Sequence, residues 1–103
     1  MQKCKITVLK CNFDEELIRE YGVKDFTKCQ RHKEGQEFIT GYGRPEGLCD
    51  EAWKGMNKFV FALAHGADNL YDGKWVEKSG VAITSCSDGL RNVIFKVERM
   101  DED

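Results

Sequence analysis

The sequence predicts a small α+β domain with the element order β-α-β-α-β-β. Three observations indicate this class: an apolar stripe of helical period over residues 50–65, strand-like segments near both ends of the chain, and an Asp-Gly pair that centres a C-terminal β-hairpin. The chain has 103 residues and one proline, so we expect a single domain over residues 1–103. Its sheet should be mixed or antiparallel and packed by one long helix.

The first half of the chain is expected to form two strands and a short helix. Residues 3–11 have the pattern of a strand with apolar side chains on both faces, which predicts cover on both sides. Asn12 is a suitable N-cap for a helix that Gly22 would end in the left-handed conformation. A polar loop over 23–35 then leads to a short strand over 36–40.

The second half contains the clearest helix and the hairpin. The helix over 50–65 begins with two acidic residues, which the positive end of a helix favours, and Gly66 is a natural stop. An irregular aromatic loop over 67–79 is expected to fold back on the body, or else to form a partner surface. The segments 80–86 and 92–98 are the strands of the hairpin.

The hairpin turn determines which side chains lie opposite each other. With Asp88-Gly89 as a two-residue loop, Thr84 lies opposite Val93. Because side chains alternate between the faces of a strand, Cys86 should share the core face with Val93.

Composition and charge exclude several classes of protein. Lys and Arg number 16 against 18 Asp and Glu, evenly spread, which argues against nucleic-acid binding. No apolar run approaches the roughly 18 residues of a membrane span, and the first residues lack a signal-peptide core. We therefore expect a cytoplasmic protein with no membrane partner and with reduced thiols. Five cysteines cannot all pair, so they are expected to be free thiols, metal ligands or buried residues.

Geometry sets two cysteine pairings aside. Cys4 and Cys11 are seven residues apart in one strand, roughly 23 Å, and on opposite faces of a regular strand. Cys49 and His65 flank one helix and are about 24 Å apart, which excludes a nucleophile and its base.

Three cysteines, Cys29, Cys49 and Cys86, remain as candidates for a shared site. Cys49 precedes a helix, whose positive end favours a thiolate; the alternative is a buried cysteine. Cys29 and His32 have C-x-x-H spacing, and with Cys49 and Cys86 they form a candidate zinc set. The alternative is a loop cysteine and a surface histidine. Arg91 is a candidate for binding a small anion, or for stabilising the hairpin turn.

The same segments carry a resemblance. They are Cys29, Glu34-Gly35-Gln36-Glu37-Phe38, Pro45-Glu46-Gly47-Leu48-Cys49 and Cys86-Ser87-Asp88-Gly89-Leu90-Arg91. Between about Lys3 and Arg99 the chain resembles a small family of uncharacterised cysteine-containing proteins of bacteria and archaea. The chain departs from that family's prolines at Gln30, Ser87 and Asn92. The resemblance implies no particular activity, but it marks the same three cysteines.

The leading hypothesis is a small binding module with a site where Cys29, Cys49 and Cys86 converge. Its ligand would be zinc or another soft metal, a thiol-reactive species or a small anion. One alternative is a thiol-dependent redox protein or enzyme that uses Cys49, with Cys29 or Cys86 as the resolving thiol. Another is an interaction protein, a homo-oligomer for example, whose cysteines only pack.

Overall fold

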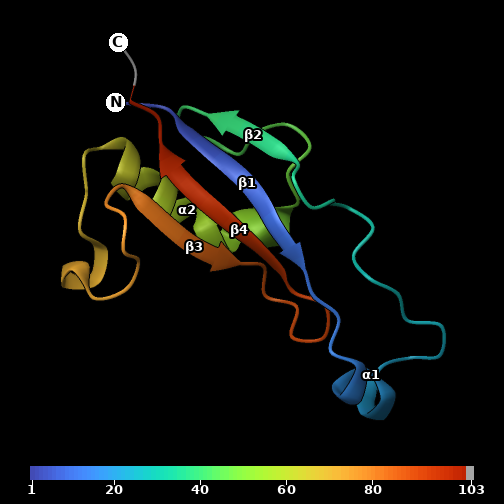
Figure 1. Cartoon of the computed structure of the whole chain (residues 1–103). Coiled ribbons are helices and arrows are strands. Elements are labelled where there is room, and N and C mark those ends of the chain that lie inside the picture. Colours follow the sequence, from blue (N-terminus) through green and yellow to red (C-terminus); the bar gives the residue numbers. More distant parts are fainter. Residues whose placement is uncertain (102–103) are drawn as a thin grey trace.

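A computed structural model describes residues 1–101 and confirms the α+β class (Figure 1). The elements are β1 (Cys4–Cys11), α1 (Glu15–Tyr21), β2 (Glu37–Thr40), α2 (Asp50–Ala64), the short 3₁₀ helix η1 (Leu70–Gly73), β3 (Val81–Ser85) and β4 (Val93–Arg99). The order of strands and α-helices is the predicted one. Within residues 1–101, no helix has both the length and the apolar character that a membrane crossing requires.

The four strands form one antiparallel sheet in the order β2-β1-β4-β3. The two central strands, β1 and β4, come from opposite ends of the chain. Helix α2 packs against one face of this sheet, and Figure 1 shows the other face open. Ile39, whose side chain points to the open face, is 53% exposed. The prediction that residues 3–11 are covered on both sides is therefore wrong, because a single helix layer covers only one face.

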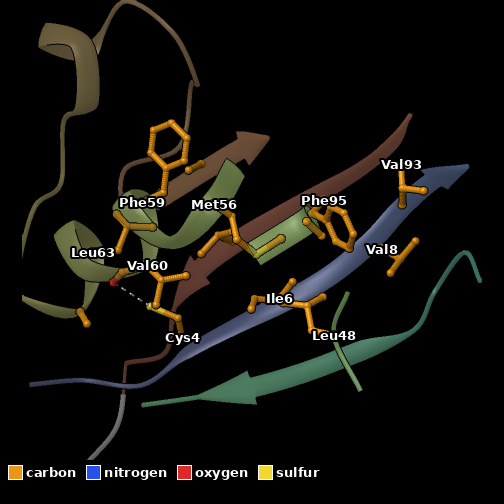
Figure 2. Close-up of a cluster of buried hydrophobic side chains, with 14 residues drawn as sticks. Cys4, Ile6, Val8, Leu48, Met56, Phe59, Val60, Leu63, Val93 and Phe95 are labelled. Carbon is orange, nitrogen blue, oxygen red and sulfur yellow. Dashed lines mark hydrogen bonds between the residues drawn. The ribbon is translucent and has the colours of Figure 1, made fainter. Parts of the chain in front are cut away.

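The core lies between α2 and the inner face of the sheet (Figure 2). The apolar stripe of α2 buries Ala52, Met56, Phe59, Val60, Leu63 and Ala64. The central strands bury every second residue, Cys4, Ile6 and Val8 in β1 and Val93, Phe95 and Val97 in β4. Burial of each large apolar side chain contributes about 1.5–3 kcal/mol, so this two-layer contact is the main stabilising feature of the fold.

A β-bulge in β1 changes which residues face the core. The register with β4 shifts just after Val8, and Leu9 is the extra residue. As a result Cys11 lies opposite the buried Val93 and returns to the inner face. Cys4 is also on that face, so the prediction that Cys4 and Cys11 lie on opposite faces is wrong. They remain at opposite ends of the strand.

A glycine brings α2 close to the end of β3. A Cβ at Gly55 would lie 2.7 Å from the carbonyl oxygen of Ser85, so only glycine fits without a shift of the backbone. The hydroxyl of Thr84 donates to the Gly55 carbonyl at 3.2 Å across the same contact. This approach places the residue after β3, Cys86, beside the first turns of α2.

Helix α1 differs from its prediction at both ends. Its N-cap is Asp14, whose carboxylate accepts the backbone N–H of Leu17 at 3.0 Å, and not Asn12. Gly22 has a φ of −75° and is extended, so it does not end the helix in the left-handed conformation. The helix buries none of its residues and stands away from the core (Figure 1).

The hairpin is wider than predicted. Thr84 pairs with Phe95 rather than with Val93, and the loop runs from residue 86 to residue 92. This register differs by two residues from the predicted one. Since side chains alternate with a period of two, the faces are unchanged. Cys86 shares the face of Val93 as predicted, but it now lies opposite Val93, to whose carbonyl oxygen its backbone N–H donates at 3.1 Å.

Candidate functional site

A cavity of about 570 Å³ lies where three connecting segments meet at one end of the sheet. The segments are the loop before β2, the start of α2 and the loop between β3 and β4. Their side chains in the cavity wall include all the candidate residues, Cys29, His32, Cys49, Cys86 and Arg91. The structure thus brings together the residues that the sequence singled out.

The three thiols reach the cavity from different elements. Cys49 immediately precedes α2, Cys86 immediately follows β3, and Cys29 lies on the irregular segment before β2. All three are free, partly buried and packed against the core. The sulfur of Cys86 accepts the backbone N–H of Val93 at 3.3 Å, which fixes it at the rim of the β3–β4 ladder.

His32 is buried in the wall between the loop and the helix. It is only 4% exposed, so it is not the surface histidine of the sequence alternative. Its ring meets Phe38 and Phe95 edge-on, with centroid distances of 5.7 Å to each. Burial lowers the pKa of His32, although a hydrogen bond from its ring to Gln36 opposes this shift. The ring is therefore neutral near pH 7.

Both ring nitrogens of His32 have hydrogen-bond partners. Nε2 lies 3.2 Å from the backbone nitrogen of Cys49 and accepts its N–H. Nδ1 is 3.2 Å from Oε1 of Gln36, which assigns the ring proton to Nδ1 as the donor of this bond. In this arrangement neither nitrogen has a lone pair free for a metal. Within residues 1–101, no three His, Cys, Asp or Glu side chains are grouped so that they could hold a metal ion.

Arg91 is used within the protein. Its Nε donates to a carboxylate oxygen of Asp88 at 3.1 Å, and its Nη1 donates to the carbonyl oxygen of Thr27 at 3.0 Å. The guanidinium carbon lies 4.4 Å from the ring centroid of Phe26. The pKa of Asp88 is lowered, first by the backbone N–H of Leu90 and then by Arg91. These contacts favour the turn-stabilising alternative over an anion-binding role.

The remaining charge in the cavity wall is also paired. Glu51 accepts the hydroxyl of Ser87 at 3.1 Å and lies 3.4 Å from the ammonium group of Lys54. The floor consists of apolar atoms, with Val93 and Phe95 among the residues that line it. The free thiols are therefore the reactive side chains of the cavity that remain available to a ligand.

Cys11 is a fourth thiol at this end of the molecule, and sequence reasoning missed it. Its sulfur donates to the carbonyl oxygen of His32 at 3.5 Å. Burial raises the pKa of Cys11, and so do the neighbouring groups Glu34, Cys29 and Cys86. The bulge in β1 turns this residue inward, and no composition pattern in β1 marks that bulge.

Cys4 is the only one of the five thiols far from this group. It is fully buried at the opposite end of β1, where its sulfur lies 3.8 Å from the carbonyl oxygen of Val60 (Figure 2). Burial raises the pKa of Cys4. This cysteine is a core residue.

No protein-family model, curated protein or solved structure matches this chain. The family resemblance therefore stays a prediction, and the case for a function depends on the geometry of the cavity.

Proposed function

We propose that this domain is a small-ligand-binding module whose cavity holds a thiophilic ligand between Cys29, Cys49 and Cys86. The observation that carries the proposal is the convergence of these three thiols from segments far apart in the sequence. Packing alone does not account for the convergence, because a core cysteine such as Cys4 is fully buried, whereas these three are partly exposed to one cavity.

The size of the cavity favours an organic ligand over a bare metal ion. Ligand sites of proteins typically have volumes of about 300–1,000 Å³, and this cavity, at about 570 Å³, falls within that range. A zinc ion instead needs sulfurs within about 2.3 Å of one centre. The thiols here are spread around a larger space, and His32 already uses both ring nitrogens.

The charge of the cavity supports a ligand of little net charge. Arg91 is paired with Asp88, and Glu51 is paired with Lys54, so neither sign of charge is left in excess without a partner. The floor is apolar. We therefore propose a compact ligand with an apolar body and a group that bonds to sulfur.

Phenylarsine oxide is a suitable probe because it combines a phenyl ring with an arsenic atom that bonds to two thiols. Its oxygen leaves as water with the two thiol protons, and no oxidant is needed. With reduced protein we expect one adduct per chain by intact-mass spectrometry, and protection of two of the three cavity thiols from later alkylation. Single serine variants at Cys29, Cys49 and Cys86 should identify the two that bind.

Cys4→Ala is the matched control, since it removes a thiol outside the cavity and should leave the adduct intact. Zn²⁺ is titrated in parallel on the same protein. The proposal is wrong if phenylarsine oxide forms no adduct, or if the adduct survives in a variant in which Cys29, Cys49 and Cys86 are all replaced by serine. It is also wrong if Zn²⁺ binds stoichiometrically and protects all three cavity thiols, because the site would then be a metal centre.

A further inference from the structure

The wall of the cavity that carries Cys29 is a segment with few connections to the rest of the molecule. Residues 23–31 contain no helix or strand. At the end of this segment the buried His32 anchors the chain to the start of α2. Nearer its middle, Arg91 contacts Phe26 and Thr27.

We propose that residues 23–31 form a flap over the thiol cavity, and that Arg91 is the positioning residue that holds it closed. The inference rests on the proposed function, because the purpose of such a flap is to admit a ligand and retain it.

The hydrogen bonds of the flap support this role. Within residues 1–101, the bond from Arg91 to the carbonyl oxygen of Thr27 is the one that joins the flap to another part of the chain. The other hydrogen bonds of the flap are local: the side chains of Thr27 and Gln30 both donate to Lys28, and the backbone N–H of Phe26 donates to Val23. Loss of the Arg91 bond would leave the flap with internal hydrogen bonds only.

Aromatic contacts add to the same anchor point. The guanidinium of Arg91 lies over the ring of Phe26, in the geometry of a cation–π interaction. Phe26 also meets Phe13, with 6.4 Å between the ring centroids. Phe13 lies between Asn12 and Asp14, whose backbone N–H groups donate to the carbonyl oxygens of Asn92 and Leu90 at 2.9 Å. Arg91 and Phe13 thus both tie Phe26 to the β3–β4 loop, and Arg91 adds the hydrogen bond to Thr27.

Arg91 is held in place by the β3–β4 loop. One carboxylate oxygen of Asp88 accepts the backbone N–H groups of Leu90 and Arg91, at 2.9 and 3.3 Å, and closes the turn. The other accepts Nε of Arg91 and orients the guanidinium toward Thr27. The same loop begins with Cys86, so Arg91 connects the Cys86 wall of the cavity to the Cys29 wall.

Hydrogen exchange of the free, reduced protein tests the flap without any ligand. In Arg91→Gln we expect exchange of the Phe26 amide, the flap N–H that donates to Val23, to rise about tenfold or more, which corresponds to about 1.4 kcal/mol, while amides of β1 and β4 are unchanged. Arg91→Lys keeps the positive charge beside Asp88 but loses the guanidinium group that bridges Asp88 and Thr27. It should give a smaller rise in exchange. Arg31→Gln is the matched control, because Arg31 is an exposed arginine of the flap itself.

Release of phenylarsine from its adduct to a competing dithiol is the second readout, and it should accelerate in Arg91→Gln by a similar factor. Equal exchange in the variant and the wild-type protein would overturn the flap, and so would a rise spread over the whole sheet. If phenylarsine oxide does not bind the wild-type protein, but exchange in Arg91→Gln rises in residues 24–31 alone, the proposed function fails. The role of Arg91 as the residue that holds the flap closed then stands.

Discussion

The backbone N–H of Cys49 donates to Nε2 of His32 at 3.2 Å, so a buried imidazole from one loop holds the residue at which α2 begins. Helix α2 has no side-chain hydrogen bond from its own N-cap, Cys49. Protonation of His32 would place a hydrogen on Nε2, where the N–H of Cys49 now points. The charge state of one ring therefore affects the wall of the thiol cavity.

Acid should weaken the fold through His32. Burial lowers the pKa of His32 in the folded protein below the ordinary value of 6.5, so the unfolded chain takes up this proton first as the pH falls. The stabilising contribution is complete above about pH 6.5 and is lost as the pH falls from there toward the folded pKa. Urea unfolding at about pH 8 and about pH 5 measures the difference.

The control for this pH dependence is His32→Gln, which removes the titrating ring. We expect the variant to be less stable at neutral pH by about 1–3 kcal/mol, the usual result of leaving buried hydrogen-bonding groups unpaired. Its stability should change less between the two pH values than that of the wild-type protein. An unchanged pH dependence would show that another group is responsible.

The fold was predictable to the extent that local periodicity determines it. The stripe of α2 and the alternation in β4 depend on residues a few positions apart, and both helix and strand were placed within about two residues. The hairpin register was wrong by two residues, yet Cys86 kept its face because the period of a strand is also two. The bulge at Leu9 was not predictable, because it depends on pairing with β4 from the other end of the chain.

The residues of the site that lie at the ends of predicted elements were predictable. Those whose position depends on tertiary packing were not. Cys49 and Cys86 lie directly at the ends of predicted elements, so the topology places them together. The burial of His32 comes from packing between Phe38 and Phe95, which are remote from each other in sequence, and a polar loop gives no indication of it. A regular strand would turn Cys11 to the face opposite Cys4, and the bulge at Leu9 brings it to the inner face instead.

Gly55→Ala should destabilise the protein, although alanine is the better helix former. In an exposed helix the exchange would stabilise by about 1 kcal/mol. Here the new methyl group would lie 2.7 Å from the carbonyl oxygen of Ser85, and separating α2 from β3 should cost about 1–3 kcal/mol. Chemical denaturation measures the change. Gly41→Ala is the control, since its methyl group would meet open space, and equal effects of the two substitutions would contradict the close approach.

Alkylation should separate Cys4 from the three cavity thiols. Cys4 is fully buried and its pKa is raised by burial, so in native protein it should react about a hundredfold or more slowly than the partly exposed Cys29, Cys49 and Cys86. Peptide mass spectrometry after brief treatment with iodoacetamide gives each rate. In urea all the thiols should react alike. A native rate for Cys4 equal to that of the cavity thiols would mean that the core opens readily.

Glu34→Gln should make Cys11 more reactive toward iodoacetamide. The pKa of Cys11 is raised first by burial and next by the charge of Glu34, so removing the charge lowers that pKa and increases the thiolate fraction at a given pH. The glutamine oxygen can still accept the backbone N–H of Cys11, which the Glu34 carboxylate accepts at 3.0 Å, so the local fold should persist. We expect a rise of about two- to fivefold near neutral pH, since the burial that dominates the shift is unchanged.

Glu20→Gln, on the exposed helix α1, is the control for this change in net charge and should leave the rate for Cys11 unaltered. The rates are best compared over a range of pH, because a charge effect moves the midpoint of the rate profile, whereas local opening raises the rate at every pH. If Glu34→Gln raised the rate without moving the midpoint, the carboxylate would act by holding β1 against its loop rather than through its charge on the thiol.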